Sequence, residues 1–236
     1  MIYIIIIMIY ILVTATVNNY FHKRIHYKKC TDIRKEQYIK SIKKLLEVTK
    51  SLKNKKVILI ENGGDNDTFL NDFKPECDTF YTNNTFDRVI KTSNKGRREM
   101  RDINQCIKKY NIKDDDFIVK ITGRYFLDDN SEFINSLYNL KNIDCIIKYG
   151  KFIKTNGAYA SFGETNNIED GSFSGLIGMR GKYVKTINYK DDGSDDRIWV
   201  EKKWANATKN INKNKIVIPK TLGINVCPGS NTYFFM

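Results

Sequence analysis

Residues 94–127 constrain the fold more than any other part of the chain. They combine a polar glycine turn, an amphipathic helix, an acidic turn and an apolar strand in one continuous unit. The strand and its exit carry Lys120, Thr122, Arg124 and Tyr125. In α/β sheets, ligands bind outside the carboxyl ends of the strands. The unit therefore predicts an α/β fold with a candidate ligand site where this strand ends.

The rest of the chain alternates short β-branched runs with amphipathic patterns. Apolar residues recur with helical spacing over Ile33–Leu52, Arg97–Tyr110, Glu132–Leu140 and Arg197–Asn206. Strand patterns occur over Lys56–Ile60, Cys77–Tyr81, Phe117–Ile121, Asp144–Lys148, Gly175–Met179 and Ile216–Ile218, with a further element over Phe86–Lys91. Such alternation indicates an α/β layered domain with a largely parallel sheet.

Charge and cysteine content limit the classes of binding partner and of metal or disulfide site that the chain is expected to have. A formal net charge of +13 suits nucleic acid, anionic lipid or phosphorylated small molecules, and equally fits a lysine-rich solvated surface. No nucleic-acid-binding motif occurs, which disfavours nucleic acid as the partner. The 5 cysteines are widely spaced without a CxxC pair, so neither a zinc site nor a disulfide framework is indicated.

The N-terminal segment Met1 to Val17 contains no charged residue. Its length is at the lower limit for a membrane span, about 17 residues of helix. We therefore predict a hydrophobic helix that anchors the protein in a membrane by a single pass. A cleaved signal and a buried strand are the alternatives. The cations that follow, from His22 to Arg24, favour a cytoplasmic C-terminal domain and leave the membrane side open.

The predicted organisation has three parts. Residues 1–20 form the transmembrane anchor, residues 21–53 a linker helix, and residues 54–236 the α/β domain. No proline- or glycine-rich linker separates the helix from the domain.

The strand exit is the first candidate site. Lys120, Thr122 and Arg124 alternate, so a continuing strand would place them on one face. Gly123 has no side chain, which allows a ligand or backbone to come close. A lysine and an arginine together neutralise a diphosphate. The alternative is an edge strand with a solvated cationic face.

Two further clusters lie near this strand. Asn94 and Lys95 stand at a helix start, where free backbone amides attract anions, although a capped surface helix explains them equally well. Asp114, Asp115 and Asp116 invite a metal interpretation. Because they precede the strand and so lie at its amino end, a solvated turn is favoured.

A later acidic cluster supplies candidate bases. Asp195, Asp196 or Glu201 would serve as a general base on a hydroxyl, and Asp195 or Asp196 would alternatively cap the helix that follows. His22 and His26 flank the N-terminal apolar run, which argues against a histidine-based triad.

The order of these pieces resembles glycosyltransferases of the GT-A fold, in particular small glycosyltransferase-like proteins of bacteria and large DNA viruses. Those proteins carry an Asn-Lys-Gly-x-x-Glu helix start, here Asn94, Lys95, Gly96 and Glu99. They also carry a Lys-x-Thr-Gly-Arg-Tyr strand, here Lys120, Thr122, Gly123, Arg124 and Tyr125. The resemblance covers Lys56 to Gly229. It implies a GT-A-like (Rossmann-like) largely parallel sheet flanked by helices.

The resemblance also implies an activity. A sugar would pass from a nucleotide-sugar donor to a hydroxyl of a glycan, lipid or protein acceptor. Mapped by order along the chain, Glu61, Asn62 and Gly63 would lie near the nucleotide, together with the helix start and the strand exit. Asp195, Asp196 or Glu201 would supply the base.

One departure from the family bears on mechanism. GT-A enzymes place Asp-x-Asp, which holds a metal and the diphosphate, where this chain has Thr122, Gly123 and Arg124. We interpret the change as cations replacing the metal, because Arg and Lys also stabilise leaving-group charge. A divalent metal (Mn²⁺ or Mg²⁺) held elsewhere and loss of activity are the alternatives. A basic non-enzymatic protein that binds nucleic acid or anionic surfaces, and a degenerate transferase that only binds nucleotide, are the rival functions.

Overall fold

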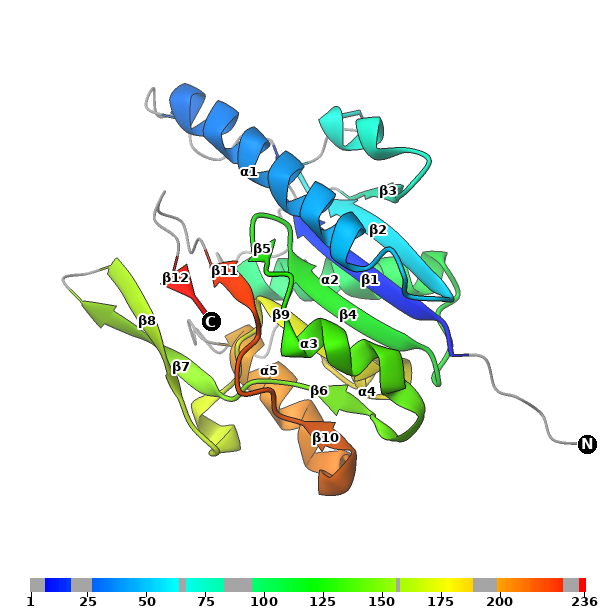
Figure 1. Ribbon diagram of the computed structural model, residues 1–236, viewed down its shortest axis with the longest axis vertical. Helices are drawn as coiled ribbons and strands as arrows, with labels where there is room; N and C mark the ends of the chain where they lie inside the picture. Colours follow the sequence, from blue (N-terminus) through cyan, green and yellow to red (C-terminus); the bar gives the residue numbers. More distant parts are fainter. Residues whose placement is uncertain are drawn as a thin grey trace, which may run out of the picture.

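The computed structural model describes residues 7–17, 27–63, 67–82, 95–155, 158–188, 199–226 and 234–236. These residues form a mixed α/β fold around a mostly parallel seven-stranded sheet (Figure 1). Its strands, in spatial order, are β10 (Ile216–Val217), β6 (Cys145–Ile146), β9 (Leu176–Arg180), β4 (Phe117–Thr122), β1 (Ile9–Ala15), β2 (Lys55–Glu61) and β3 (Asp78–Tyr81). Only β9 runs antiparallel to its neighbours.

The remaining elements surround this sheet. The α-helices described are α1 (Tyr27–Val48), α2 (Lys95–Lys109), α3 (Glu132–Ser136), α4 (Gly181–Val184) and α5 (Trp199–Ala207). The 3₁₀ turns are η1 (Phe69–Phe73), η2 (Leu137–Asn142), η3 (Ile168–Asp170), η4 (Thr208–Asn210) and η5 (Lys213–Lys215). A small sheet joins β12 (Phe234–Phe235), β11 (Ile224–Val226) and β5 (Phe126–Leu127), and a hairpin joins β7 (Gly150–Thr155) to β8 (Ala158–Glu164).

Ile9–Ala15 of the N-terminal apolar run form an internal strand of the sheet, so the predicted hydrophobic N-terminal helix is wrong. β1 pairs in parallel with β2 on one side and with β4 on the other. Ile11, Leu12 and Val13 are at most 1% exposed. A parallel strand covered on both faces reads as a continuous apolar run, and Ile and Val favour strands. A strand with these two properties therefore has the same apolar composition as a membrane-spanning helix.

The predicted membrane localisation is contradicted as well. None of the helices in the described ranges is long enough and apolar enough to cross a bilayer. The prediction depended on the apolar run that forms β1, and α1 carries lysines throughout its 22 residues.

Helices cover both faces of the sheet because successive side chains of a strand point to opposite sides. On one face, Val13 of β1 belongs to the same buried cluster as Tyr38 and Ile42 of α1. On the other face, Leu12 belongs to a cluster with residues of α2 and α5, including Trp204. Figure 1 shows α1 lying along the sheet and the β7–β8 hairpin projecting at its side. The core is thus divided into two layers by the sheet.

Several element boundaries differ from the predicted ones. α1 ends at Val48, and Lys55 Nζ donates to the carbonyl oxygens of Thr49 and Lys50 at 2.6 and 3.2 Å. The helix predicted over Glu132–Leu140 is broken, because Asn139 has φ −132° and separates α3 from the end of η2. The element predicted over Phe86–Lys91 lies outside the described residues.

Candidate functional site

The carboxyl ends of β1, β2 and β4 meet at one edge of the sheet. The chain passes from β1 to β2 through α1 on one face, and from β3 to β4 through α2 on the other. Because β2 and β4 lie on opposite sides of β1, the strand order reverses there. Such switch points are where open α/β sheets bind ligands.

Glu61 and Asn62 tie the exits of the strands together. The fully buried Glu61 carboxylate accepts hydrogen bonds from Val17 N at 2.9 Å and from Gly63 N at 2.7 Å. Asn62 Oδ1 accepts from Thr16 Oγ1 at 2.6 Å, and Asn62 Nδ2 donates to Asp102 Oδ2 of α2 at 2.9 Å. The structure therefore places these predicted residues at the expected edge, where their hydrogen bonds connect β1, β2 and α2.

Lys120 is deeply buried and points toward α2. Its ammonium group lies 2.9 Å from Glu99 Oε1 and donates to Thr122 Oγ1 at 3.1 Å and to the Ser174 carbonyl oxygen at 2.6 Å. Thr14 Oγ1 donates to the same Glu99 oxygen at 2.6 Å. An ammonium group has three N–H donors, and these three acceptors satisfy all of them. Lys120 and Thr122 share a face, as the alternation predicts.

Arg124 lies on the other side of the strand exit, contrary to the prediction that it shares a face with Lys120. Its Nη1 donates to Gln37 Oε1 of α1 at 3.2 Å. β4 ends at Thr122, and the turn that follows changes the direction of the next side chains. Strand alternation therefore stops before Arg124.

Four cations from three segments lie near one another at this edge. Arg34 of α1 donates Nη2 to the Thr16 carbonyl oxygen at 2.9 Å, which places it beside the exit of β1. The pKa of Lys95, at the start of α2, lies below its usual range, first through desolvation and then through repulsion by Arg34, Arg98 and Arg124. We call these four residues the edge cations. The repulsion that Lys95 experiences from the three arginines makes this part of the edge attractive to an anion.

Glu201 lies in the first turn of α5 and is joined to Lys120 through one residue. Ser174 Oγ donates to Glu201 Oε1 at 3.2 Å, while the Ser174 carbonyl accepts from Lys120. Burial raises the pKa of Glu201, and the Glu99 charge raises it further. A hydrogen bond from the Glu201 backbone, the Ser174 hydroxyl and the Lys120 charge lower it. A carboxyl group with a raised pKa is suited to general acid–base chemistry. Of the three predicted bases, Asp195 and Asp196 lie outside the described residues, as does Asn94.

Tyr125 and Gly123 have packing roles in the structure. The Tyr125 ring is 9% exposed and stacks on Phe173, with ring centroids 5.9 Å apart. Gly123 lies against the Tyr38 ring, whose hydroxyl accepts from Thr16 N at 3.0 Å. The close approach that the glycine permits is thus made by Tyr38 and by the Thr14 carbonyl.

Gly123→Ala is expected to lower the free energy of unfolding by about 1–3 kcal/mol through overpacking. A Cβ built at Gly123 lies 2.8 Å from Tyr38 Cε1 and 3.1 Å from the Thr14 carbonyl oxygen. Urea denaturation measures the loss. Gly163→Ala is the control, because its nearest neighbour is the tip of the exposed Ile153 side chain at 3.0 Å. An equal loss in both variants would contradict the role assigned to Tyr38.

The acidic triplet lies at the amino end of β4. Asp114 pairs with Lys185 at 2.6 Å, which lowers the pKa of Asp114, and Asp116 accepts from Lys113 N at 2.7 Å. No group of three His, Cys, Asp and Glu side chains in the described ranges is arranged to hold a metal. The described side chains where Asp-x-Asp would stand are cationic or neutral, a donor set that does not fit Mn²⁺ or Mg²⁺.

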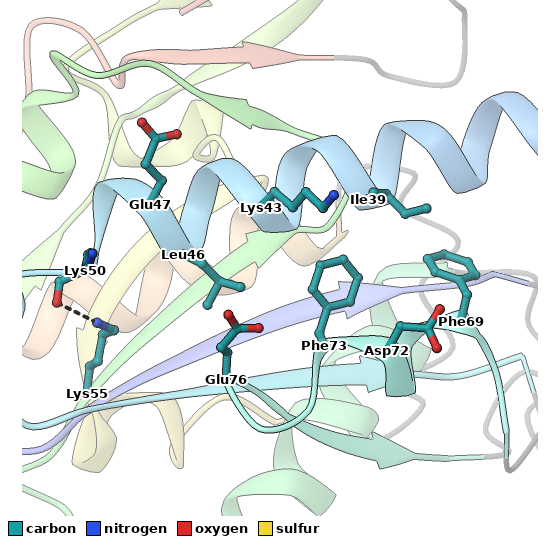
Figure 2. Close-up of a pocket in the computed structure, with 10 residues that line it drawn as sticks. All are labelled: Ile39, Lys43, Leu46, Glu47, Lys50, Lys55, Phe69, Asp72, Phe73 and Glu76. Atoms are coloured by element: carbon teal, nitrogen blue, oxygen red, sulfur yellow. Dashed lines mark hydrogen bonds between the residues drawn. The ribbon is translucent and has the colours of Figure 1, made fainter.

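A surface pocket of about 890 Å³ lies away from this edge, between α1 and η1 (Figure 2). Its apolar lining comes from Ile39, Leu46, Phe69 and Phe73. Its lining also includes three lysines (Lys43, Lys50 and Lys55) and three acidic residues (Glu47, Asp72 and Glu76), so its charge is balanced. None of the predicted site residues is among the described residues that line it. The predicted site residues and the buried polar contacts lie instead at the carboxyl edge of the sheet.

Several residues of this edge were missed by sequence reasoning, namely Thr14, Thr16, Arg34, Gln37, Asp102 and Ser174. If the apolar run is interpreted as a strand, Thr14 and Thr16 are recognisable as polar residues at its carboxyl end. Arg34 and Gln37 are spaced as neighbours on one face of a helix, a weak signal without that strand. Asp102 and Ser174 offer no comparable pattern.

Comparison with known proteins supports the fold alone. No protein-family model matches the chain, and no curated protein does. A Bacillus anthracis protein described as a glucose-1-phosphate thymidylyltransferase has a similar structure, with 13% identity and a TM-score of 0.50, covering 91% of this chain and 86% of that one.

Two other solved structures are more distant. One is described as a nucleotide-diphospho-sugar transferase from Desulfovibrio desulfuricans G20, with 13% identity, 91% and 80% coverage and a TM-score of 0.46. The other is 4-diphosphocytidyl-2C-methyl-D-erythritol synthase, with 8% identity, 91% and 89% coverage and a TM-score of 0.48. The similarity to the Bacillus anthracis structure supports the predicted α/β fold, while the two sequence motifs remain predictions.

Proposed function

We propose that the protein is a GT-A-like glycosyltransferase that moves a sugar from a nucleotide-sugar donor to a hydroxyl acceptor. The observation that carries this proposal is the position of Arg34 and Arg124 at the switch point of the sheet, where Arg34 contacts the exit of β1 and Arg124 follows β4 and contacts α1. A nucleoside diphosphate carries concentrated negative charge, and guanidinium groups bind phosphate oxygens in a bidentate manner. Arg124 and Arg34 would hold the diphosphate, and the exits of β1 and β2 would hold the nucleoside.

The chemical step would use Glu201 as the base. The acceptor oxygen attacks C1 of the sugar and forms the new glycosidic bond. The bond from C1 to the diphosphate oxygen breaks, and its electron pair leaves with the nucleoside diphosphate. The hydroxyl proton passes to the Glu201 carboxylate, with Asp195 or Asp196 as the alternative bases. The edge cations stabilise the leaving-group charge, and no step is routed through a metal.

A buried base distinguishes this reaction from nucleotidyl transfer. The Bacillus anthracis protein is described as a glucose-1-phosphate thymidylyltransferase. A sugar phosphate is already ionised near neutral pH, because the second pKa of a phosphate monoester is about 6. A hydroxyl acceptor instead needs a group that removes its proton. The raised pKa of Glu201, caused chiefly by burial, supports a hydroxyl acceptor.

Arg124→Ala is expected to weaken binding of a nucleoside diphosphate about 10- to 100-fold, since a hydrogen bond to a charged group contributes about 1.5–3 kcal/mol. Isothermal titration with UDP, GDP, CDP and dTDP measures this. Lys56→Ala is the control, because Lys56 lies at the amino end of β2 and pairs with Asp78 at 2.8 Å. Binding that survives Arg124→Ala unchanged removes Arg124 from the site. Salt-sensitive DNA binding without nucleotide binding would favour the non-enzymatic alternative.

A further inference from the structure

Lys120 has the contacts of an internal structural cation. Its side chain is 2% exposed, and Glu99, Thr122 and Ser174 use its three donors. Binding a phosphate would require breaking at least one of these contacts inside the protein. Buried charges are stable only when paired and hydrogen-bonded, so exchanging these partners for an external anion is costly.

The same ammonium group is close to the candidate base. Ser174 links them, because its carbonyl oxygen accepts from Lys120 and its hydroxyl donates to Glu201 Oε1. The second oxygen, Glu201 Oε2, is inaccessible and has no hydrogen-bond partner in the described part of the chain. Trp204, one turn further along α5, likewise has a buried Nε1 without a partner there. Ser174 is therefore the residue that links Lys120 to the carboxyl group of Glu201.

We propose that the buried Glu99–Lys120 ion pair is a positioning device that sets the protonation of Glu201. It rests on the proposed function only in taking Glu201 as the base. Lys120 acts through Ser174 and through its charge, and it is not a ligand of the donor diphosphate. Glu99 holds Lys120 in place and opposes its effect.

The two charges act on Glu201 in opposite directions. Glu99 raises the pKa of Glu201, and Lys120 lowers it. Several charged groups on elements beside α5 have partners of their own. Glu169 of η3 pairs with Lys209 at 2.7 Å, and Lys182 of α4 lies 4.0 Å from Asp144. On α2, which also packs on α5, Asp102 accepts from Asn62 Nδ2 and from Thr82 Oγ1, and α2 further carries Arg101 and the buried Arg97. Because burial raises the pKa of Glu201 overall, the folded state binds the extra proton, and stability falls as pH rises from the ordinary pKa to the raised one. Glu201→Gln is expected to remove this slope.

The direct test is the titration of Glu201 by carbon NMR of protein labelled with [δ-¹³C]glutamate. The Glu201 signal is identified by its loss in Glu201→Gln. We expect its midpoint to fall in Glu99→Gln and to rise in Lys120→Met. Ser174→Ala is expected to raise it, because the hydroxyl that stabilises the carboxylate is removed. Lys120→Arg keeps the charge and is expected to restore a midpoint near that of the parent protein.

A merely structural pair would give a different result. Midpoints that stay unchanged, or that move in the same direction in Glu99→Gln and Lys120→Met, would overturn the proposal. If Lys120→Met does not fold, Glu99→Gln and Ser174→Ala still give opposite expected shifts.

Nucleotide binding separates this inference from the proposed function. Lys120→Met is expected to keep the affinity of the parent protein for the nucleoside diphosphate within about threefold. A loss as large as that of Arg124→Ala would make Lys120 a phosphate ligand and would overturn the inference alone. Absence of nucleotide binding in the parent protein would instead contradict the proposed function, whatever the titration shows.

Discussion

Replacing Leu12 with aspartate is expected to abolish cooperative folding, because it places an unpaired carboxylate in the middle of the sheet. Leu12 is fully buried in the layer between β1, α2 and α5. Burying an isolated charge costs several kcal/mol or more, whereas a whole domain is stable by only about 5–15 kcal/mol. The variant is thus expected to lose most or all of its stability.

Thermal unfolding followed by circular dichroism checks this expectation. Ile153→Asp introduces the same charge at a side chain that is 45% exposed in β7, and is expected to leave the transition nearly unchanged. If the apolar run were only an anchor outside the fold, Leu12→Asp would unfold at the same temperature as the parent protein. That result would remove β1 from the core.

Lys120→Ala is expected to destabilise the protein by about 3–5 kcal/mol, the usual cost of breaking a buried ion pair. The variant leaves Glu99 without its partner and the Ser174 carbonyl without its donor. It also removes the aliphatic part of a side chain that is among the largest fully buried ones. Urea denaturation at neutral pH measures the loss.

The matched comparison is the double variant Lys120→Met with Glu99→Gln. Replacing both members of a buried pair by uncharged groups of similar size is often nearly neutral. The double variant is therefore expected to be more stable than Lys120→Ala, and a double-mutant cycle gives the coupling between the two sites. If Lys120→Ala lost no more unfolding free energy than the double variant, the ion pair would contribute little to stability.

The sequence indicated the α/β alternation and most of the strands, since these depend on local patterns. It could not separate β1 from a membrane span. Both a bilayer and a sheet covered on two faces select uninterrupted apolar residues, and the run Met1 to Val17 satisfies either. Only the pairing of β1 with β2 and β4, which are distant in sequence, distinguishes them.

Because β1 was interpreted as a membrane span, the sequence prediction took β2 as the first strand of the sheet and omitted the site residues that follow β1. With β1 in place, the first strand exit is Thr14 to Val17, and Glu61 to Gly63 end the second strand. The residues predicted from the family order still lie at the same edge, because parallel strands share their carboxyl ends. Their neighbours on α1, such as Arg34 and Gln37, depend on the crossover from β1 to β2 and were missed.

The role of Lys120 also required the structure. Its sequence position beside Arg124 suggested one cationic face, but the turn at Gly123 sends Arg124 toward α1. Lys120 instead meets Glu99, which the family-like helix start places one turn into α2. A pattern of charges along one segment cannot show which of them are neutralised by another.

The measurement that most directly tests the central claim is amide hydrogen exchange with and without the nucleoside diphosphate that binds best. Protection is expected in peptides that cover residues 14–17, 61–63, 95–102 and 120–125, the strand exits and the start of α2. The same peptides in Arg124→Ala are expected to show little protection at equal nucleotide concentration. Protection confined to the pocket between α1 and η1, or none at all, would contradict a donor site at the carboxyl edge of the sheet.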